Sequence, residues 1–402
     1  MKNNSKRNFL KTASSVGLFL ATSNISIWSP NNFAYSSSLP LSVNLQNKDK
    51  NDLMLPDGFT SRIIATTGKI SSYNSSYKWH KYPDGGAVFS TKKNGWIYVS
   101  NSEVGNKKGG VGVIEFNKNA DIINSYSICS KTSMNCAGGS TPWNTWLTCE
   151  ETINGFVWEC DPFGKKKQKR YKSLGKFIHE AAVVDPNSFY VYLTEDHKKG
   201  GFYRFKADSV SKDKADLSAG ILQVAKINDN KKVTWINVPN PLAKSIKEND
   251  TSQALMKREK NKKIKYTIFN RGEGAWFHND KVFFATTGDN SIWTYNTKKE
   301  KFKKIYKGGK VLSDPDNVTV SKNGLILAAE DSGNMEIVAI SQKTNRVFPL
   351  VRIIGHDGSE ITGPAFDPSG TRLYFSSQRG RKKKIGHKGI TYEVSGPFEK
   401  YI

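Results

Sequence analysis

Acidic residues recur at one position in this chain, directly after short apolar segments. Six segments share the order of a turn residue, an apolar or aromatic run, small or hydroxyl residues and then usually an acid: NGWIYVSNSE (94–103), NTWLTCEE (144–151), NSFYVYLTED (187–196), NDKVFFATTGD (279–289), NGLILAAED (323–331) and GTRLYFSSQRG (370–380). The acids at these ends are Glu103, Glu150, Glu151, Glu195, Asp196, Asp289, Glu330 and Asp331. A single acid there can simply mark where a strand meets solvent. Converging carboxylates instead need cations between them, and oxygen ligands suit calcium, magnesium, manganese or iron(III). Their recurrence favours a metal site.

The segment NCAGGSTPWNTWLTCEE, residues 135–151, adds a thiol to this chemistry. The four cysteines of the chain are Cys129, Cys136, Cys149 and Cys160. No CxxC spacing is present, so a structural zinc site is not indicated. In an exported protein one or two disulfides are the default expectation, and Cys149 is either a core thiol or the partner of Cys160.

The spacing of the six segments predicts how the acids are brought together. Most lie about 45 residues apart, which is typical of β-propeller blades. We predict an all-β, six-bladed β-propeller, with a double-sheet sandwich as the alternative. The gap between the third and fourth segments is about twice as long and predicts a Lys-rich surface insertion at about 207–265. GITYEV (389–394) is expected to close the ring against an N-terminal strand such as FTSRIIAT (59–66).

The N-terminus resembles a twin-arginine export signal. SKRNFLK (5–11) precedes the moderately apolar ASSVGLFLA (13–21), which is too short to span a bilayer. We predict an export signal at 1–37, a polar linker at 38–52 and a single propeller domain at 53–402, with no transmembrane segment in the mature protein. An ordinary secretory signal or a disordered tail is the alternative. The predicted location is periplasmic or extracellular.

The charge balance is strongly basic. Lys and Arg number 61 against 36 Asp and Glu, giving a net charge of +25. This charge attracts anions in general, but the lysines are scattered and no nucleic-acid-reading motif accompanies them. A solvated Lys-rich surface is therefore the favoured interpretation, and no specific nucleic acid partner is predicted.

Several motifs together resemble the PhoX-type alkaline phosphatase family of bacteria. They run in order from about Lys78 to Arg379: NCAGGSTPWNTWLTCEET, KFIHEAAVVDP, VYLTED, RGEGAWF, DPDNVTV, AAEDSGNMEIV and GHDGSEITGPAFDPSGTRLYFSSQRG. The resemblance implies a six-bladed propeller, export by the twin-arginine machinery, a buried cluster of iron(III) and calcium, and hydrolysis of phosphomonoesters in phosphate acquisition.

The resemblance also implies roles for individual residues. Cys136 resembles the family's thiolate ligand to iron, and Glu195 and Glu273 resemble its iron carboxylates. Arg271 resembles the cation that holds substrate phosphate, which makes Arg271 and Glu273 the expected catalytic residues. The remaining candidates for calcium ligands or supporting positions are Glu103, Glu151, Glu180, Glu330 and Glu360. Whether Glu150 or Glu151 faces the metals depends on a one-residue strand register.

The predicted function is thus metal-dependent hydrolysis of a small-molecule phosphomonoester. No Ser, Thr or His shows an activating pattern such as GxSxG, so a covalent phosphoseryl route is not indicated. Two alternatives remain open. One is a calcium-dependent phosphodiesterase or lactonase-like hydrolase, and the other is a non-enzymatic exported propeller stabilised by calcium.

Overall fold

A computed structural model describes residues 43–244, 264–381 and 388–402 of the chain. The chain divides into two units, Met1–Leu39 and Pro40–Ile402, and the fold below is that of the second. The predicted export signal at 1–37 and the first part of the predicted linker lie outside the described residues. In the described part, no helix has the length and apolar character needed to cross a membrane.

Six antiparallel sheets of four or five strands make up the described fold, and we number them as blades from 1 to 6 along the chain. Blade 1 contains β3 (Pro83–Ser90), β4 (Trp96–Ser102), β5 (Gly109–Phe116) and β6 (Ile122–Thr132). Blade 2 contains β7 (Asn135–Ser140), β8 (Trp146–Glu150), β9 (Val157–Cys160) and β10 (Lys169–Tyr171). Blade 3 contains β11 (His179–Val184), β12 (Val191–Glu195), β13 (Phe202–Ala207), β16 (Gly220–Ile227) and β17 (Val233–Asn237).

The second half of the ring repeats this plan and borrows two N-terminal strands. Blade 4 contains β18 (Gly272–His278), β19 (Lys281–Thr286), β20 (Ser291–Asn296) and β21 (Lys301–Lys307). Blade 5 contains β22 (Pro315–Val320), β23 (Ile326–Glu330), β24 (Glu336–Ser341), β25 (Arg346–Ile353) and β1 (Leu53–Met54). Blade 6 contains β26 (Ile361–Phe366), β27 (Arg372–Ser377), β28 (Ile390–Ser395) and β2 (Thr60–Thr66). The remaining elements are the hairpin β14 (Val210–Ser211) and β15 (Lys214–Ala215) and two 3₁₀ turns, η3 (Thr287–Asp289) and η4 (Phe398–Tyr401).

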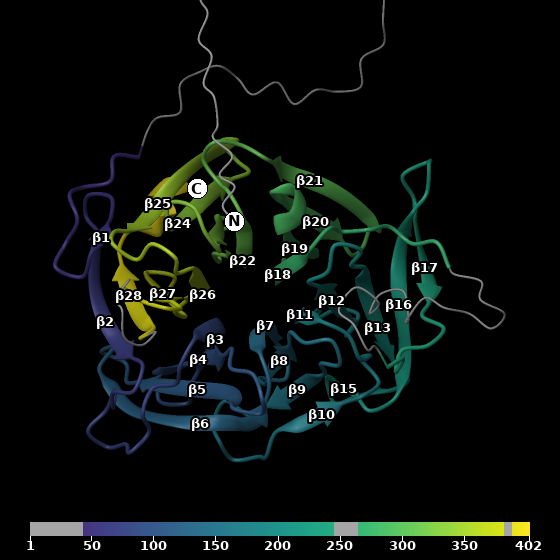
Figure 1. Cartoon of the computed structure of the whole chain (residues 1–402), viewed down its shortest axis with the longest axis horizontal. Coiled ribbons are helices and arrows are strands. Elements are labelled where there is room, and N and C mark those ends of the chain that lie inside the picture. The colour runs from purple at the N-terminus through teal and green to yellow at the C-terminus, as the bar shows by residue number, and fades with distance from the viewer. Residues whose placement is uncertain (1–42, 245–263, 382–387) are drawn as a thin grey trace, which may run out of the picture. The chain divides into compact units, whose positions relative to one another are not determined.

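The first strand of each blade lies innermost, and these six strands form a closed ring (Figure 1). The ring encloses the central channel, a pocket lined by residues of five innermost strands, among them Gly85, Ala137 and Gly274. Each contacts its neighbours in the order β3, β7, β11, β18, β22, β26 and back to β3. The fold is therefore a six-bladed β-propeller, as the repeat predicts, and not a sandwich.

Ring closure uses the strand pair that the sequence indicates. β2 pairs with β28 in antiparallel register from Thr60↔Ser395 to Thr66↔Ile390. A second closure pairs β1 with β25 through Leu53↔Ile353 and Met54↔Arg352. The N-terminal segment thus completes both blade 5 and blade 6, which leaves fewer unpaired strand edges.

The six repeated segments are the second strands of the blades. The apolar runs of these strands face both sides of the sheet because both faces are covered, and small, hydroxyl or acidic residues follow the runs. Every residue of β8, β12 and β23 is buried. The turns that lead into them each contain a residue at positive φ: Asn94, Asn144, Phe189, Asp280, Gly324 and Gly370. Asn, Asp and Gly tolerate this conformation best, which explains the turn residues at the start of most copies.

The hydrophobic core is divided among the blade interfaces. One buried cluster lies between each pair of adjacent blades, for example Leu147 of blade 2 with Leu193 of blade 3, and Ile361 of blade 6 with Leu327 of blade 5. The six clusters of the described chain thus follow the ring. Because a single blade has no core of its own, the ring must assemble before the core is complete.

Part of the span predicted as an insertion, about 207–265, belongs to blade 3. Its strands β16 and β17 are the fourth and fifth strands of blade 3. Residues 245–263 of that span lie outside the described residues. The doubled spacing between the third and fourth segments therefore reflects, in part, a longer blade.

The disulfide expectation is wrong for this structure, in which all four cysteines are buried and free. Cys149 lies in the core between blades 2 and 3, whereas Cys160 packs with Cys129 between blades 1 and 2. Cys149 and Cys160 therefore face opposite sides of the same sheet and cannot pair.

Candidate metal centre

The second residue of every innermost strand occupies an equivalent place. These residues are Asp84, Cys136, Glu180, Glu273, Asp316 and Thr362. In each blade the pairing between the first and second strands is irregular at or next to this position. Such bulges bend a strand and redirect a side chain, and they are common beside functional sites. Five of six blades thus supply an acid or a thiol from the innermost strand.

A second set of polar side chains comes from the residue that follows each second strand. Its members are Glu103, Glu151, Asp196, Thr287, Asp331 and Gln378. The first and second strands of a blade are antiparallel, so the start of one lies beside the end of the other. Both sets therefore lie at one end of the channel.

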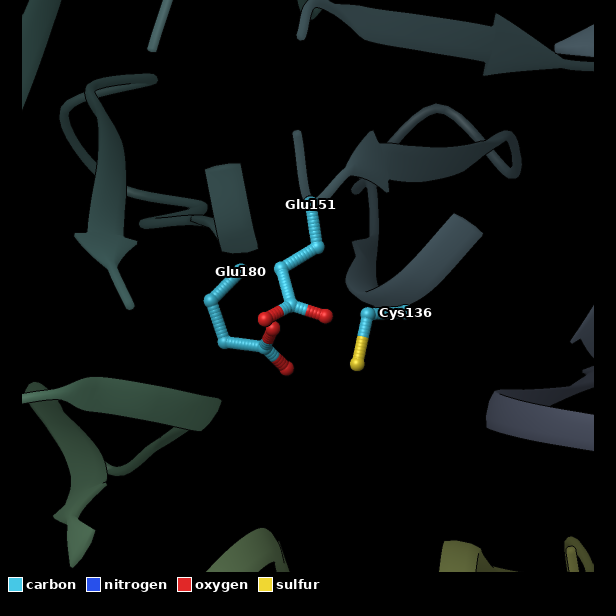
Figure 2. Close-up of side chains that lie close together, drawn as sticks. All are labelled: Cys136, Glu151 and Glu180. Carbon is cyan, nitrogen blue, oxygen red and sulfur yellow. The ribbon is translucent and has the colours of Figure 1, made fainter. Parts of the chain in front are cut away.

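Three groups of potential metal ligands form at this end: Cys136, Glu151 and Glu180; Asp84, Glu103 and Glu360; and Glu180, Glu273 and Asp316. Within each group, one ligand atom per residue lies within 4.8 Å of the others. Figure 2 shows the Glu151 and Glu180 carboxylates and the Cys136 sulfur directed toward a shared space. Glu180 belongs to two groups, so two of the sites share a ligand.

Glu180 provides the test of whether the residues fit a cation. Its side chain is fully buried, and neither carboxylate oxygen has a hydrogen-bond partner among the described residues. A buried carboxylate without partners costs several kcal/mol, on the order of the penalty for any buried ion. A bound cation removes this penalty, and the residues present therefore fit a metal centre.

The burial of these acids also shifts the pKa values in the three groups. Burial, followed by the charges of neighbouring carboxylates, raises the pKa values of Glu151, Glu180 and Asp316 well above their usual range. Burial and Glu103 raise the pKa of Asp84 to about 7, although hydrogen bonds from Gln378 and the Gly85 amide oppose the shift. Without cations, the centre therefore retains protons; cations would favour the ionised form.

The backbone at Cys136 is fixed by a hydrogen-bond chain between blades 1 and 2. Asn101 Nδ2 donates to the Cys136 carbonyl at 2.7 Å and to the Ala137 carbonyl at 2.9 Å. Trp146 Nε1 donates to Asn101 Oδ1 at 2.9 Å. Burial raises the pKa of the Cys136 thiol, and nearby carboxylates raise it further, so the thiolate needs a cation to form at neutral pH.

The predicted ligands Glu195 and Glu330 are not members of the three groups. Glu330 accepts hydrogen bonds from the Ser313 amide at 3.0 Å and the Glu336 amide at 3.1 Å. Glu195 accepts from the Gly201 amide at 3.0 Å and from the Tyr203 hydroxyl at 2.6 Å. Both side chains therefore tie loops to the ends of their strands.

Glu150 has the same loop-tying arrangement in blade 2 and is not a member of the three groups. Its carboxylate accepts from the Ser133 amide at 2.9 Å and the Phe156 amide at 3.1 Å. Glu151, the next residue, joins Cys136 and Glu180. In blades 3 and 5 the corresponding next residues are Asp196 and Asp331, which raise the pKa values of Glu151 and Glu360, respectively, after the larger effect of burial.

The other predicted residues lie at this end of the channel. Glu103 accepts a hydrogen bond from Gln378 Nε2 at 2.7 Å, and the same nitrogen donates to Asp84 at 2.6 Å. Glu360 forms an ion pair with Arg379 Nη2 at 3.1 Å. Glu273 forms one with Arg271 Nη2 at 3.1 Å.

Arg271 directly precedes β18 and has a φ of 55°. The residues before three other innermost strands, Tyr82, Met134 and Asp314, share this left-handed conformation, so it is a recurring feature of the blades. Arg271 Nε and Nη2 donate to the two carboxylate oxygens of Asp196 at 2.8 and 3.0 Å. These bonds raise the pKa of the guanidinium, which stays charged.

Asp84, Asp316 and Asn101 are not among the site residues predicted from the sequence. The signal that could have found Asp84 is a short motif that three innermost strands share, an acid followed by small residues, as in DGG, EAA and EGA. Asp316 does not fit this motif, because Asn317 and Val318 follow it. The small residues let blades approach. A Cβ at Gly274 would meet the Asn317 Cα at 2.8 Å, and one at Gly85 would meet the Ala137 Cα at 2.6 Å. The glycine after Glu273 therefore serves contact between blades.

Comparison with known proteins identifies the family. The sequence model described as Alkaline phosphatase PhoX matches residues 90–157 and 154–304, more than half of the chain. The chain belongs to the PhoX family. A solved structure of Pseudomonas fluorescens PhoX in complex with vanadate, a transition state analogue, resembles this chain with a TM-score of 0.70 at 15% identity. The match covers 88% of this chain and 98% of that one, and it shows the shared fold.

Other propellers resemble this PhoX-family chain more weakly. A putative gluconolactonase gives a TM-score of 0.44 at 12% identity, covering 86% of this chain and 94% of that one. Streptogramin B lyase gives 0.45 at 12% identity, covering 84% and 98%. A comparison with curated proteins found no match.

Proposed function

We propose that this PhoX-family protein is a metal-dependent phosphomonoester hydrolase whose reaction takes place at the centre formed by the three ligand groups. The observation that carries the proposal is Glu180, a fully buried carboxylate that two ligand groups share and that accepts no hydrogen bond from the described residues. A chain of an alkaline phosphatase family with such a centre has both the ancestry and the ligands for the reaction.

The donor types suggest how the metals divide. The group with Cys136 combines a soft thiolate with carboxylates and suits iron. The groups of Asp84 and Asp316 contain only carboxylates and suit calcium, which takes oxygen ligands. When bound, the cations would supply positive charge beside the phosphoryl oxygens, which metal-assisted phosphate hydrolysis requires.

The protein's own contribution is positioning and charge. Asp196 and Glu273 hold Arg271 at the mouth of the centre, where its planar guanidinium can orient a phosphoryl group. The transition state of phosphoryl transfer spreads charge over its equatorial oxygens, so a fixed guanidinium stabilises it. Glu195 and Glu330 act in this proposal as loop-tying residues that place Asp196 and Asp331.

The substrate is proposed to be a small phosphomonoester that reaches the protein outside the cytoplasm, in the periplasm or beyond the cell. Export through the twin-arginine machinery is part of this proposal, because a folded protein can then leave with its metals inserted. Its test is the effect of replacing Lys6 and Arg7 by glutamine on the amount of exported protein.

The experiment is a substrate panel combined with metal analysis. Protein purified after export should contain iron and calcium and hydrolyse p-nitrophenyl phosphate faster than a diester or a lactone. Chelation should remove activity, and re-addition of both metals should restore it. For substitutions of carboxylates in the centre, the matched control is Glu300→Gln, which should keep metal and activity. This surface carboxylate is half exposed and pairs with Arg204 away from the centre.

Each other outcome selects a different function. Faster turnover of a diester or lactone would show that the centre hydrolyses that class of ester instead of a phosphomonoester. Calcium without iron, and no turnover of any ester, would identify a calcium-stabilised scaffold. Monoester hydrolysis that survives complete removal of metal would refute the proposal.

A further inference from the structure

Two arginines from different blades lie at the metal centre. Arg271 precedes the first strand of blade 4, and Arg379 follows Gln378 at the end of the second strand of blade 6. Their side chains are 35% and 33% exposed, so each is partly open to solvent. Asp331 of blade 5, the blade between them, contributes to the electrostatic environment of both guanidinium groups.

The two guanidinium groups differ in how many of their nitrogens are already used. Arg271 places Nε and Nη2 on Asp196 and Nη2 also on Glu273. Arg379 places Nη2 on Glu360 at 3.1 Å, its one ion pair within the described residues. Nε and Nη1 of Arg379 therefore remain as donors, whereas Arg271 keeps only Nη1.

The backbone that carries Arg379 is firmly held although its side chain is exposed. The Arg379 amide donates to Ser359 Oγ at 2.9 Å, and the Gln378 amide donates to the Glu360 carbonyl at 3.0 Å. Ser359 Oγ is also 2.9 Å from Ser377 Oγ. A fixed backbone lowers the entropy that the side chain loses when it binds a ligand.

The charge around Arg379 keeps it cationic at any relevant pH. Burial lowers its pKa, but the carboxylates of Glu360, Glu103, Asp331 and Asp84 raise it overall. A permanently charged, planar group with donors left unused matches a phosphate, whose oxygens accept charge-assisted hydrogen bonds.

We propose that Arg379 is a phosphate-binding residue of this centre, which it contacts from blade 6 and in addition to Arg271. This proposal rests on the proposed function. Through Nη1, Arg379 donates to an oxygen of the phosphoryl group, while Nη2 stays on Glu360.

The test measures binding of inorganic phosphate to the metal-loaded protein by calorimetry, together with KM and kcat for p-nitrophenyl phosphate. Arg379→Ala should weaken phosphate binding about 10- to 100-fold, the usual effect of losing charge-assisted hydrogen bonds. KM should rise more than kcat falls. Arg379→Lys should bind phosphate more tightly than Arg379→Ala but less tightly than the wild type, because lysine restores the charge without the planar guanidinium.

The control is Arg381→Ala. Arg381 lies two residues further on, is about half exposed and donates from Nε to Asp52 at 2.7 Å, outside the three ligand groups. The Arg381→Ala variant should bind phosphate as tightly as the wild type. This result would exclude a general effect of removing positive charge from this loop.

Two results would overturn the assignment. One is wild-type phosphate affinity in Arg379→Ala at full metal content. The other is loss of metal from this variant in elemental analysis, because Arg379 would then only support Glu360. Failure of the proposed function gives a different result. In that case the metal-loaded wild type binds phosphate through Arg379 but hydrolyses no monoester, so the anion site is present and the protein is not a phosphatase.

Discussion

Two sets of buried acids occur in the blades of this propeller, and they differ in what surrounds their oxygens. The loop-tying glutamates Glu150 and Glu330 each accept two backbone amide hydrogen bonds. Glu180 is equally buried and accepts none from the described residues. Burial alone therefore does not mark a metal ligand. The distinguishing property is whether the protein itself satisfies the carboxylate, because an unsatisfied one needs a cation or a proton.

The largest effect expected from this contrast is that of Glu180→Gln. The substitution removes a ligand shared by two groups, so we expect at least a 100-fold loss of phosphomonoesterase activity and loss of bound metal. Activity and metal content should be measured on the same preparation. Without metal, the variant should be at least as stable as the wild type, because a neutral amide replaces a buried carboxyl group that can ionise only at a high cost in free energy. A variant with wild-type metal content would show that Glu180 is not a ligand.

The second expected effect is a pH dependence that appears only when metal is absent. The pKa of Asp84 rises from 3.8 to about 7 on folding, through burial and the charge of Glu103. The folded state then holds more protons than the unfolded state between these values, so stability falls as pH rises from about 4 to 7. The loss is roughly 4 kcal/mol for a shift of this size. Urea unfolding of chelated protein across this range should show it.

Metal-loaded protein is the comparison for this pH profile. Bound cations favour the ionised carboxylates, so its stability should change little between pH 5 and 7. Equal slopes for the chelated and the loaded protein would contradict the assignment of Asp84 to the centre. Chelated Asp84→Asn protein should have a flatter profile than the chelated wild type.

The sequence predicts the fold well and the members of the three groups of potential ligands less well, and the reason is physical. The apolar runs of the second strands cover both faces, so their repeat is strong and predicts six blades. The innermost strands carry Asp84, Glu180 and Glu273, but they are rich in small residues because neighbouring blades approach there. They therefore leave little hydrophobic pattern, and Asp84 was not predicted.

Register is the other limit. Adjacent residues at the end of a strand point in opposite directions, so Glu150 and Glu151 are equivalent in the sequence until the strand is placed. The prediction included Glu151 and also the loop-tying Glu195 and Glu330. Resemblance to a family supplied the roles of Cys136 and Arg271, which no periodicity reveals.

A smaller effect is expected for the loop-tying glutamates. Glu330→Gln keeps the shape of the side chain but weakens its two hydrogen bonds from the Ser313 and Glu336 amides. Removing one charged acceptor in this way costs about 1–3 kcal/mol of unfolding free energy. Because Glu330 holds a loop, the loss should be the same with and without metal. A loss seen only in metal-loaded protein would instead make Glu330 a ligand.

The smallest expected effect concerns Asn101, which belongs to neither set and yet fixes Cys136. Asn101→Ala removes two hydrogen bonds to the Cys136 and Ala137 carbonyls and leaves Trp146 Nε1 without its acceptor. We expect about 1–2 kcal/mol of destabilisation, in the range for such buried bonds.

If Cys136 binds iron, Asn101→Ala should also change the position or intensity of the visible sulfur-to-metal absorption band. The control is Asn317→Ala, an analogous substitution between blades 5 and 6, which should leave that band unchanged. Asn317 Nδ2 donates to Asp316 Oδ1 at 3.0 Å, and its Oδ1 accepts from the Gly363 amide at 3.0 Å, so it supports an all-carboxylate group that does not contain Cys136. An unchanged band in Asn101→Ala would show that the innermost strand of blade 2 holds its thiol without help from blade 1.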